Sequence, residues 1–242
     1  MYKYKWMPAS VLTILFAMQA TGSNAEPRIG TAASTRPKVE AISGANTQTL
    51  SEGSEIYENQ TVRTGNRGRA DLVFVDKTNL SVGPRSEVRL DEFVYDPNGS
   101  AGSVVMQATH GTFRFVTGSQ AHEVYRVSTP HGTLGVHGTT VELLVNKPGE
   151  DCVTKLRLVE GKAEYKVAKT GKVAQLNDPN KNNVACISAS GEVTYSTSSE
   201  SIVAGLGEVS TPPPPGVPGN PGGGTTPIAP IIPPVMSPSR PG

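Results

Sequence analysis

Short runs of alternating apolar and polar residues, each ended by glycine or proline, are the feature that most restricts the fold of this chain. From Ser86 to Asp91 the alternation is strict, with Val88 and Leu90 on one face and polar or charged side chains on the other. A period of two residues is typical of a strand with one buried face, and glycine and proline end such strands in turns. We therefore expect an all-β domain, either a solenoid-like stack of short strands or a two-sheet β-sandwich.

The segment 127–145 is expected to form a corner in this arrangement. Pro130 lacks a backbone donor and keeps Thr129 extended, so a strand that arrives before it must turn there. The glycines of the segment recur every third residue, at Gly132, Gly135 and Gly138. They permit positive φ or close backbone approach, and the β-branched run 139–141 then leads into a strand.

Two other interpretations of this corner are less favoured. A dinucleotide-binding fingerprint requires Gly-x-Gly-x-x-Gly before a helix, whereas the spacing here is Gly-x-x-Gly-x-x-Gly before strand-forming residues. His131, His137 and Glu142 carry side chains that bind several divalent ions. The pattern contains neither a close His-x-His pair nor Cys-x-x-Cys, so we predict no metal site.

The first 25 residues are typical of a secretory signal peptide. Lys3 and Lys5 precede the apolar run 11–18, and Ser23-Asn24-Ala25 stands before Glu26. The apolar run is much shorter than the ~20 residues that span a bilayer, and no other segment approaches that length. We expect cleavage between Ala25 and Glu26, a periplasmic or extracellular location, and no transmembrane segment in the mature chain.

The net charge bears on the kind of partner, and the cysteine content bears on the presence of a disulfide. Lys and Arg number 22 against 21 Asp and Glu, and the net charge of +1 provides no field for nucleic acid, which we therefore exclude as a partner. Cys152 and Cys186 are the two cysteines of the chain. In an oxidising compartment an isolated pair most simply forms a disulfide.

Composition divides the chain into four parts. After the signal peptide (1–25), residues 26–37 are small and polar and are expected to be a flexible leader, and the all-β domain is expected over 38–199. Within it, 155–167 is expected to form a hairpin about Glu160-Gly161. Residues 200–242 are rich in proline and glycine, which excludes helices and sheet interiors, and form an expected disordered tail. The tail is expected to be a spacer or, less favoured, a ligand for an aromatic groove.

Seven short motifs, taken in order, resemble the FecR domain from about Lys38 to about Val167. They are Val62-Arg63-Thr64-Gly65, Gly68-Arg69-Ala70, Asp76-Lys77-Thr78, Ser86-x-Val88, Gly111-Thr112-x-Arg114-Phe115, Thr129-Pro130 and Gly135-Val136-His137-Gly138-Thr139. That family is named after a periplasmic regulator that passes a signal from an iron-citrate transporter to a sigma factor. The sequence departs from the family at His137, where Arg is usual, and at Lys77, where Gly is usual.

The resemblance implies a sensing or interaction module without catalytic residues, and the sequence contains no nucleophile elbow or phosphate-cradling loop. The regulator joins its domain to a membrane helix and a sigma-factor-binding segment, neither of which is found here, so direct sigma-factor control is not expected. We expect a non-enzymatic protein without cofactors that binds an envelope protein through the corner. The residues expected to make this contact are Thr129, His131, Thr133, His137 and Thr139.

Two alternatives remain open. The first is a structural envelope protein that docks through its proline-rich tail. The second is a metal-dependent small-molecule binder or enzyme built on His110, His122, His131 and His137.

Overall fold

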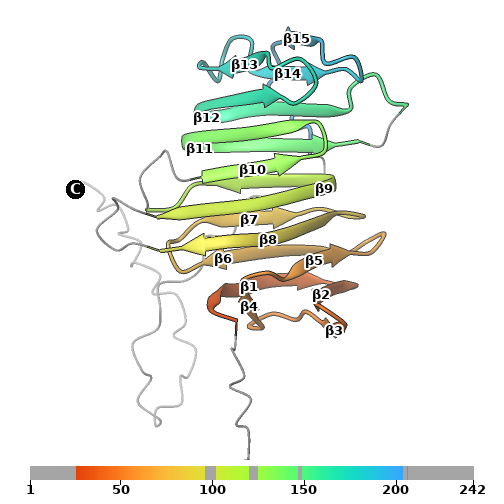
Figure 1. Ribbon diagram of the computed structural model, residues 1–242, viewed down its shortest axis with the longest axis vertical. Helices are drawn as coiled ribbons and strands as arrows, with labels where there is room; N and C mark the ends of the chain where they lie inside the picture. Colours follow the sequence, from red (N-terminus) through yellow and green to blue (C-terminus); the bar gives the residue numbers. More distant parts are fainter. Residues whose placement is uncertain (1–25, 96–101, 120–124, 147–148, 204–205, 207–242) are drawn as a thin grey trace, which may run out of the picture. The chain divides into compact units, whose positions relative to one another are not determined.

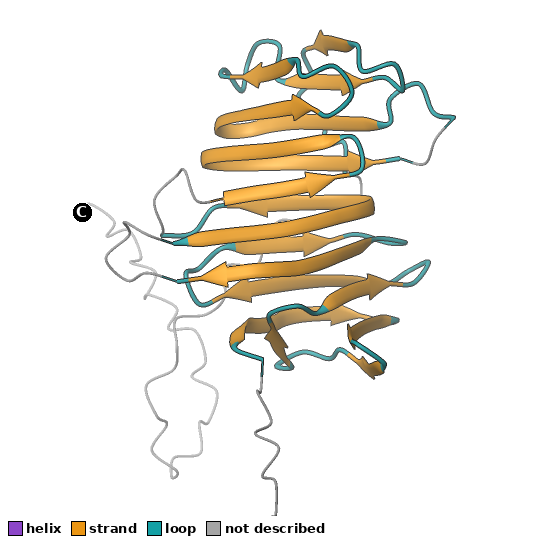
Figure 2. Cartoon of the chain, viewed as in Figure 1, coloured by secondary structure: helices purple, strands orange, loops and turns teal. Residues whose placement is uncertain are grey.

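The described part of the chain is built entirely from strands. The computed structural model describes residues 26–95, 102–119, 125–146, 149–203 and 206, which contain fifteen strands and no helix. All of these residues belong to one compact unit, Met1–Ser210, and the second unit, Thr211–Gly242, lies outside the described residues. Figure 2 shows strands joined mostly by short loops. The described part of the chain offers no helix long and apolar enough to cross a membrane.

The strands pair into two ladders, which we call the first and the second sheet. From edge to edge, the first sheet contains β3 (Asn46–Thr49), β2 (Val39–Ser43), β5 (Thr61–Thr64), β8 (Glu87–Val94), β9 (Ser103–Val116), β10 (Tyr125–Thr129), β11 (Gly132–Val145), β12 (Thr154–Val167) and β13 (Val173–Leu176). The second contains β4 (Glu55–Tyr57), β1 (Arg28–Arg36), β6 (Arg69–Phe74), β7 (Asn79–Val82), then β9, β11 and β12 again, followed by β14 (Val184–Ile187) and β15 (Val193–Ser196). Neighbouring strands are antiparallel except β9 and β10, which are parallel. Figure 1 shows the strands stacked in this order, from β1–β5 to β13–β15.

Three long strands belong to both sheets because each of them bends midway. In β12 the buried side chains include Leu156 and Leu158 before the bend and Ala163 and Tyr165 after it, so the inward face changes from even to odd positions. The bends fall at Gly111 in β9, Gly138 in β11 and Gly161 in β12, whose φ angles are 111°, 59° and 80°. The buried residues of both sheets form one hydrophobic cluster. The sheets therefore face each other across a shared core, as in a two-sheet sandwich.

The bend in β12 replaces the hairpin expected for residues 155–167. A Cβ at Gly161 would overlap the carbonyl oxygen of Gly138, so the bends of β11 and β12 pack directly against each other. Both halves of β12 keep β11 as their neighbour, since His137 pairs with Lys162 on one side of the bend and Val141 pairs with Leu158 on the other. A glycine between two strand-forming runs suits a turn or a bend equally well. Only the neighbouring strand decides between them.

The prediction of a flexible leader over residues 26–37 is wrong for most of that segment. Residues 28–36 form β1, which lies between β4 and β6 and contributes Ile29 and Ala32 to the core. The other face of the strand is polar, and Ser34 Oγ donates to Asp71 Oδ2 at 2.7 Å. Small polar residues with two apolar ones resemble a linker in sequence, but two paired neighbours supply the hydrogen bonds that make them a strand.

The unusual lysine at position 77 lies in a tight turn between β6 and β7. Lys77 has a φ of +70°, a conformation in which glycine has no steric penalty, and this accounts for glycine being usual there. Beside it, Asp76 is fully buried. Its carboxylate accepts hydrogen bonds from Thr78 Oγ1 at 2.7 Å and from Tyr125 Oη at 2.9 Å. Asp76 therefore anchors the turn to β10 and is not the solvated surface acid that its position in a polar turn suggests.

Candidate binding site

The five residues expected to bind a partner do not form one cluster. Thr129, His131 and Thr133 lie at or beside the turn between β10 and β11, whereas His137 and Thr139 lie at the bend of β11. The seven residue steps of strand from Gly132 to Thr139 correspond to roughly 20 Å. Thr139 is buried, and its hydroxyl donates to the carbonyl oxygen of Lys162 at 2.5 Å. The side chain of His137 lies outside the described residues, as does His122.

Side-chain hydrogen bonds fix the turn between β10 and β11 on both sides. Thr129 Oγ1 lies 2.6 Å from Tyr165 Oη, and His131 Nδ1 lies 2.9 Å from Thr154 Oγ1. Burial raises the pKa of Tyr165 and outweighs the opposite effect of its hydrogen bonds, so the phenol stays protonated. Burial also lowers the pKa of His131, so the ring is neutral at neutral pH. The turn is thus held by neutral groups, and its position is well defined.

A pocket of about 360 Å³ opens beside this turn. Its walls come from the β10–β11 turn, the residue before β12, the end of β12 with the residues after it, and the end of β14 with the β14–β15 turn. The lining residues are Pro130, His131, Val153, Val167, Ala168, Lys169, Ile187, Ser188, Ala189 and Gly191. Most are apolar or small, and His131 and Lys169 are the ionisable ones among them. A concave apolar surface with a few polar groups at its rim is the usual form of a site for a small apolar ligand or a side chain of a partner.

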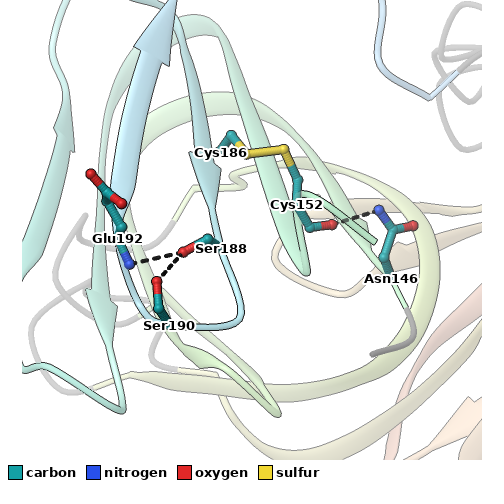
Figure 3. Close-up of a disulfide and its surroundings, with 6 residues drawn as sticks. All are labelled: Asn146, Cys152, Cys186, Ser188, Ser190 and Glu192. Atoms are coloured by element: carbon teal, nitrogen blue, oxygen red, sulfur yellow. Dashed lines mark hydrogen bonds between the residues drawn. A yellow bond between two sulfur atoms is a disulfide. The ribbon is translucent and has the colours of Figure 1, made fainter. Parts of the chain in front are cut away.

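The disulfide holds two walls of this pocket together. Cys152 and Cys186 are bonded, which confirms the expected pair. They directly precede Val153 and Ile187, which both line the pocket. Figure 3 shows the bond beside the β14–β15 turn, where Ser188 Oγ lies 2.7 Å from Ser190 Oγ and accepts a hydrogen bond from Glu192 N at 3.1 Å. Reduction would therefore loosen a wall of the pocket as well as the fold.

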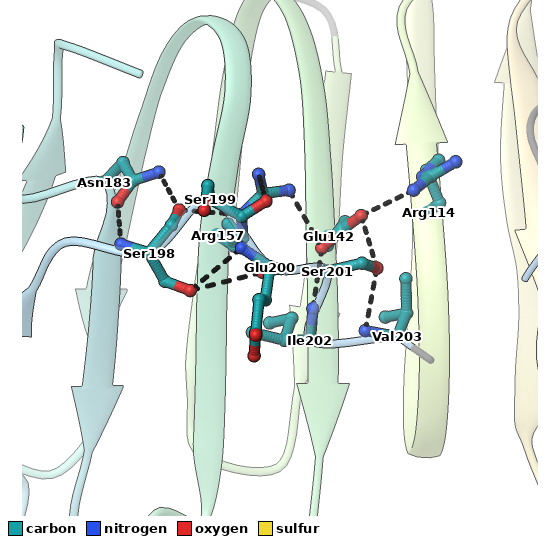
Figure 4. A network of polar contacts seen from close by, with 10 residues as sticks. All are labelled: Arg114, Glu142, Arg157, Asn183, Ser198, Ser199, Glu200, Ser201, Ile202 and Val203. Atoms are coloured by element: carbon teal, nitrogen blue, oxygen red, sulfur yellow. Dashed lines mark hydrogen bonds and ion pairs between the residues drawn. The ribbon is translucent and has the colours of Figure 1, made fainter. Parts of the chain in front are cut away.

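A buried carboxylate on the outer face of the second sheet was not foreseen. Glu142 in β11 is fully buried, and it pairs across the sheet with Arg114 in β9 and Arg157 in β12. Arg114 Nη2 lies 2.6 Å from its Oε1, and Arg157 Nη1 lies 3.3 Å from its Oε2 (Figure 4). Two guanidinium groups therefore compensate one carboxylate.

Residues 198–203, which we call the strap, cover this carboxylate. Ser201 Oγ donates to Glu142 Oε1 at 2.8 Å, and Ile202 N donates to Oε2 at 2.9 Å. At the start of the strap, Ser198 and Asn183 exchange two hydrogen bonds of 2.8 and 2.9 Å, and at its end Val203 is fully buried. Figure 4 shows the strap crossing β12 and β11. Packed structure therefore continues to Val203. The prediction that the disordered tail begins at residue 200 is wrong by four residues.

Arg114 and the strap together keep Glu142 ionised. Burial by itself raises the pKa of this carboxyl, but hydrogen bonds from Arg114, Ser201 and Ile202, together with the Arg114 charge, lower the pKa below its ordinary value. Glu142 therefore stays charged, and both of its oxygens are occupied. This excludes the role of Glu142 as a metal ligand that the sequence allows. Among the described residues no three His, Cys, Asp or Glu side chains gather closely enough to hold a metal ion.

A comparison with protein-family models agrees with the resemblance found in the motifs. The family model described as FecR protein matches residues 60–164. No curated protein matches the sequence. Two crystal structures, at 2.50 and 1.65 Å resolution, of a candidate anti-sigma factor from Parabacteroides distasonis ATCC 8503 are similar to this chain, each with 15% sequence identity and a TM-score of 0.45. Each similarity covers 57% of this chain and 59% of the other, so the chain spans less than two thirds of these proteins.

Fold and site together define an all-β protein with a small pocket at one end of a sandwich. The stretch that the FecR family model matches runs from β5 into the second half of β12. The match ends before the last residues of β12, the β14–β15 turn and the strap. The pocket is therefore built partly from the matched stretch and partly from residues that follow it.

Proposed function

We propose that this protein is an exported, non-enzymatic FecR-domain protein that senses or signals in the bacterial envelope by binding a partner through the pocket at the β10–β11 turn. The observation that carries the proposal is the pocket itself. Its lining is mostly apolar, a disulfide joins two of its walls, and it contains His131 and adjoins Thr129 of the expected binding residues. Its ionisable lining residues are one histidine with a lowered pKa and one lysine that donates to Ala189 O, so the lining offers no nucleophile activated by a base.

The shape of the pocket favours an apolar side chain or a short apolar segment as its occupant. Val153, Val167 and Ile187 supply apolar contact area, and each buried side chain of a partner would contribute about 1.5–3 kcal/mol before the costs of association. Most backbone groups of the Ser188–Glu192 turn are already paired, as Ser188 N with Glu192 O at 3.0 Å and Gly191 N with Ser188 O at 2.9 Å, so side chains would supply most of the contact. Signalling follows from the FecR domain, in which the resemblance implies sensing or interaction.

A steric substitution at the rim tests the pocket. Ala189→Trp would fill it, and Ala45→Trp in the β2–β3 turn adds the same bulk at a distant exposed site. We expect both variants to keep the melting temperature within a few degrees, and only Ala189→Trp to lose the envelope partner recovered by crosslinking to the purified protein. Equal recovery by both variants would place the binding surface elsewhere.

A second experiment separates this function from tail-mediated docking. A variant that ends after Val203 is expected to recover the same partner if the pocket binds it, and to lose it if the proline-rich tail does. Export is tested separately by the intact mass of protein secreted from a bacterial host, which is expected to begin at Glu26. A secreted protein that retains Met1 would contradict it.

A further inference from the structure

A second site, separate from the pocket, lies on the turns next to β1. Three arginines and two prolines line a groove of about 570 Å³ there, together with an asparagine. The lining residues are Arg36, Pro37, Asn66, Arg67, Arg69 and Pro84. They come from the end of β1, the β1–β2, β5–β6 and β7–β8 connections and the start of β6. The protein as a whole carries a net charge of only +1, so this concentration of positive charge is local.

The arrangement of two of these arginines is unfavourable without an anion. Arg36 in β1 lies directly opposite Arg69 in β6, in register on the antiparallel pair. Like charges in directly opposed positions destabilise a sheet. No guanidinium of the three forms an ion pair with another described residue, whereas Arg28, Arg63 and Arg89 each pair with an acid. Asp71, which lies two residues after Arg69 on the same face of β6, already accepts hydrogen bonds from the hydroxyl groups of Ser34 and Ser81 at 2.7 and 2.5 Å.

The third arginine is carried by a turn that the structure fixes in place. Gly65 N donates to Lys38 O at 2.8 Å, Gly68 N donates to Gly65 O at 3.1 Å, and Arg85 N donates to Gly65 O at 3.0 Å. Gly68 also packs where any Cβ would overlap Lys38 O. Arg67 projects from this turn, and Pro37 and Pro84 restrict the other two walls. The ordering that a ligand would otherwise impose on the backbone is therefore already present.

We propose that this groove binds a compact soluble ligand that carries two or more phosphate groups. Guanidinium groups match phosphate oxygens with paired hydrogen bonds, and three of them around one hollow balance more than a single negative charge. An anion between Arg36 and Arg69 removes their mutual repulsion, so binding also stabilises the fold. The hollow is concave and of small-molecule size, which fits a soluble ligand better than the flat surface of an anionic membrane.

Calorimetric titration of the purified full chain with pyrophosphate tests the proposal. The variant Arg36→Ser, Arg67→Ser, Arg69→Ser removes the groove's charges. The matched control Arg28→Ser, Arg63→Ser, Arg89→Ser removes three ion-paired arginines and changes the net charge equally. At low ionic strength we expect the groove variant to weaken pyrophosphate binding at least about tenfold and the control less than about twofold. Orthophosphate should bind more weakly than pyrophosphate.

Three results would overturn the proposal. They are the absence of pyrophosphate binding by the unmodified protein, an equal loss in both triple variants, and binding to vesicles of anionic phospholipid without binding to pyrophosphate. A stability measurement adds a readout that needs no ligand. Arg36→Gln is expected to raise the melting temperature at low salt, and the gain should shrink as salt is added. A lower melting temperature at low salt would contradict the repulsion between Arg36 and Arg69. Ala189→Trp should leave pyrophosphate binding unchanged, so failure here and failure of the proposed pocket are distinguishable.

Discussion

Replacement of Glu142 by glutamine is the sharpest test of how the strap is held. The substitution preserves shape and leaves one oxygen to accept from Ser201 or Ile202, but it removes the charge between Arg114 and Arg157. Those side chains are 16% and 12% exposed, so both would keep a largely buried positive charge without its partner. Breaking a buried ion pair by removing one partner costs about 3–5 kcal/mol, and the retained hydrogen bond places Glu142→Gln near the lower end, at about 3 kcal/mol.

Thermal unfolding followed by circular dichroism measures this cost. For a domain of 150–250 residues, 1 kcal/mol corresponds to about 2–4 °C, so the melting temperature should fall by roughly 6–12 °C. The control is Glu164→Gln, an exposed carboxylate in the first-sheet half of β12, which should change it by less than about 2 °C. Limited proteolysis should also cut the variant faster within 198–203. A melting temperature within 2 °C of the unmodified protein, with an unchanged cleavage pattern, would refute the reasoning.

The pH dependence gives an independent check. Because the pKa of Glu142 is lowered in the folded state, its contribution to stability is fully present above the ordinary carboxyl pKa of 4.5 and is lost as the pH falls through the folded pKa below it. Glutamine does not titrate. The difference in unfolding free energy between the unmodified protein and Glu142→Gln should therefore be constant from pH 5 upward and shrink below about pH 4.5. A difference that grows in acid would contradict the assigned sign.

Three further predictions follow from the disulfide, the β10–β11 turn and the bend of β12. Cys152→Ser with Cys186→Ser opens a loop of 34 residues, which is expected to cost roughly 3–4 kcal/mol in a denaturant titration and to abolish partner binding at the pocket; a loss below 1 kcal/mol would contradict it. The ring protons of His131 should titrate in NMR with a pKa below 6.5, because burial lowers it, and a value above 6.5 would show a solvated ring or an acidic partner. Gly161→Ala should destabilise by more than Gly171→Ala in the same measurement, since both have positive φ but only Gly161 faces a neighbouring backbone. Equal costs would mean that the bends of β11 and β12 can separate.

Much of the fold could be predicted from the local pattern of apolar, polar and turn-forming residues. Strict alternation in residues such as 86–91 identifies strands without reference to the rest of the molecule, because one face of a strand must be buried and the side-chain period is two. Predicting the disulfide between Cys152 and Cys186 required only the presence of two cysteines and the expectation of an oxidising compartment. The motifs that resemble the FecR domain could also be recognised in the sequence. One of them contains the turn at Lys77, and the positive φ there explains why the family usually has glycine at this position.

Pairing between distant strands decided the rest. Gly161 bends a strand instead of ending it because β11 bends beside it, and Ser34 belongs to a strand because β4 and β6 flank β1. Glu142 alternates as a solvent-facing residue in sequence, and it is buried only because a strap some sixty residues later crosses its sheet. Arg36 and Arg69 are 33 positions apart and become opposed charges through the register of β1 and β6. Local sequence determines the propensity of each segment, whereas register and long-range hydrogen bonds, which local sequence does not encode, determine which side chains meet.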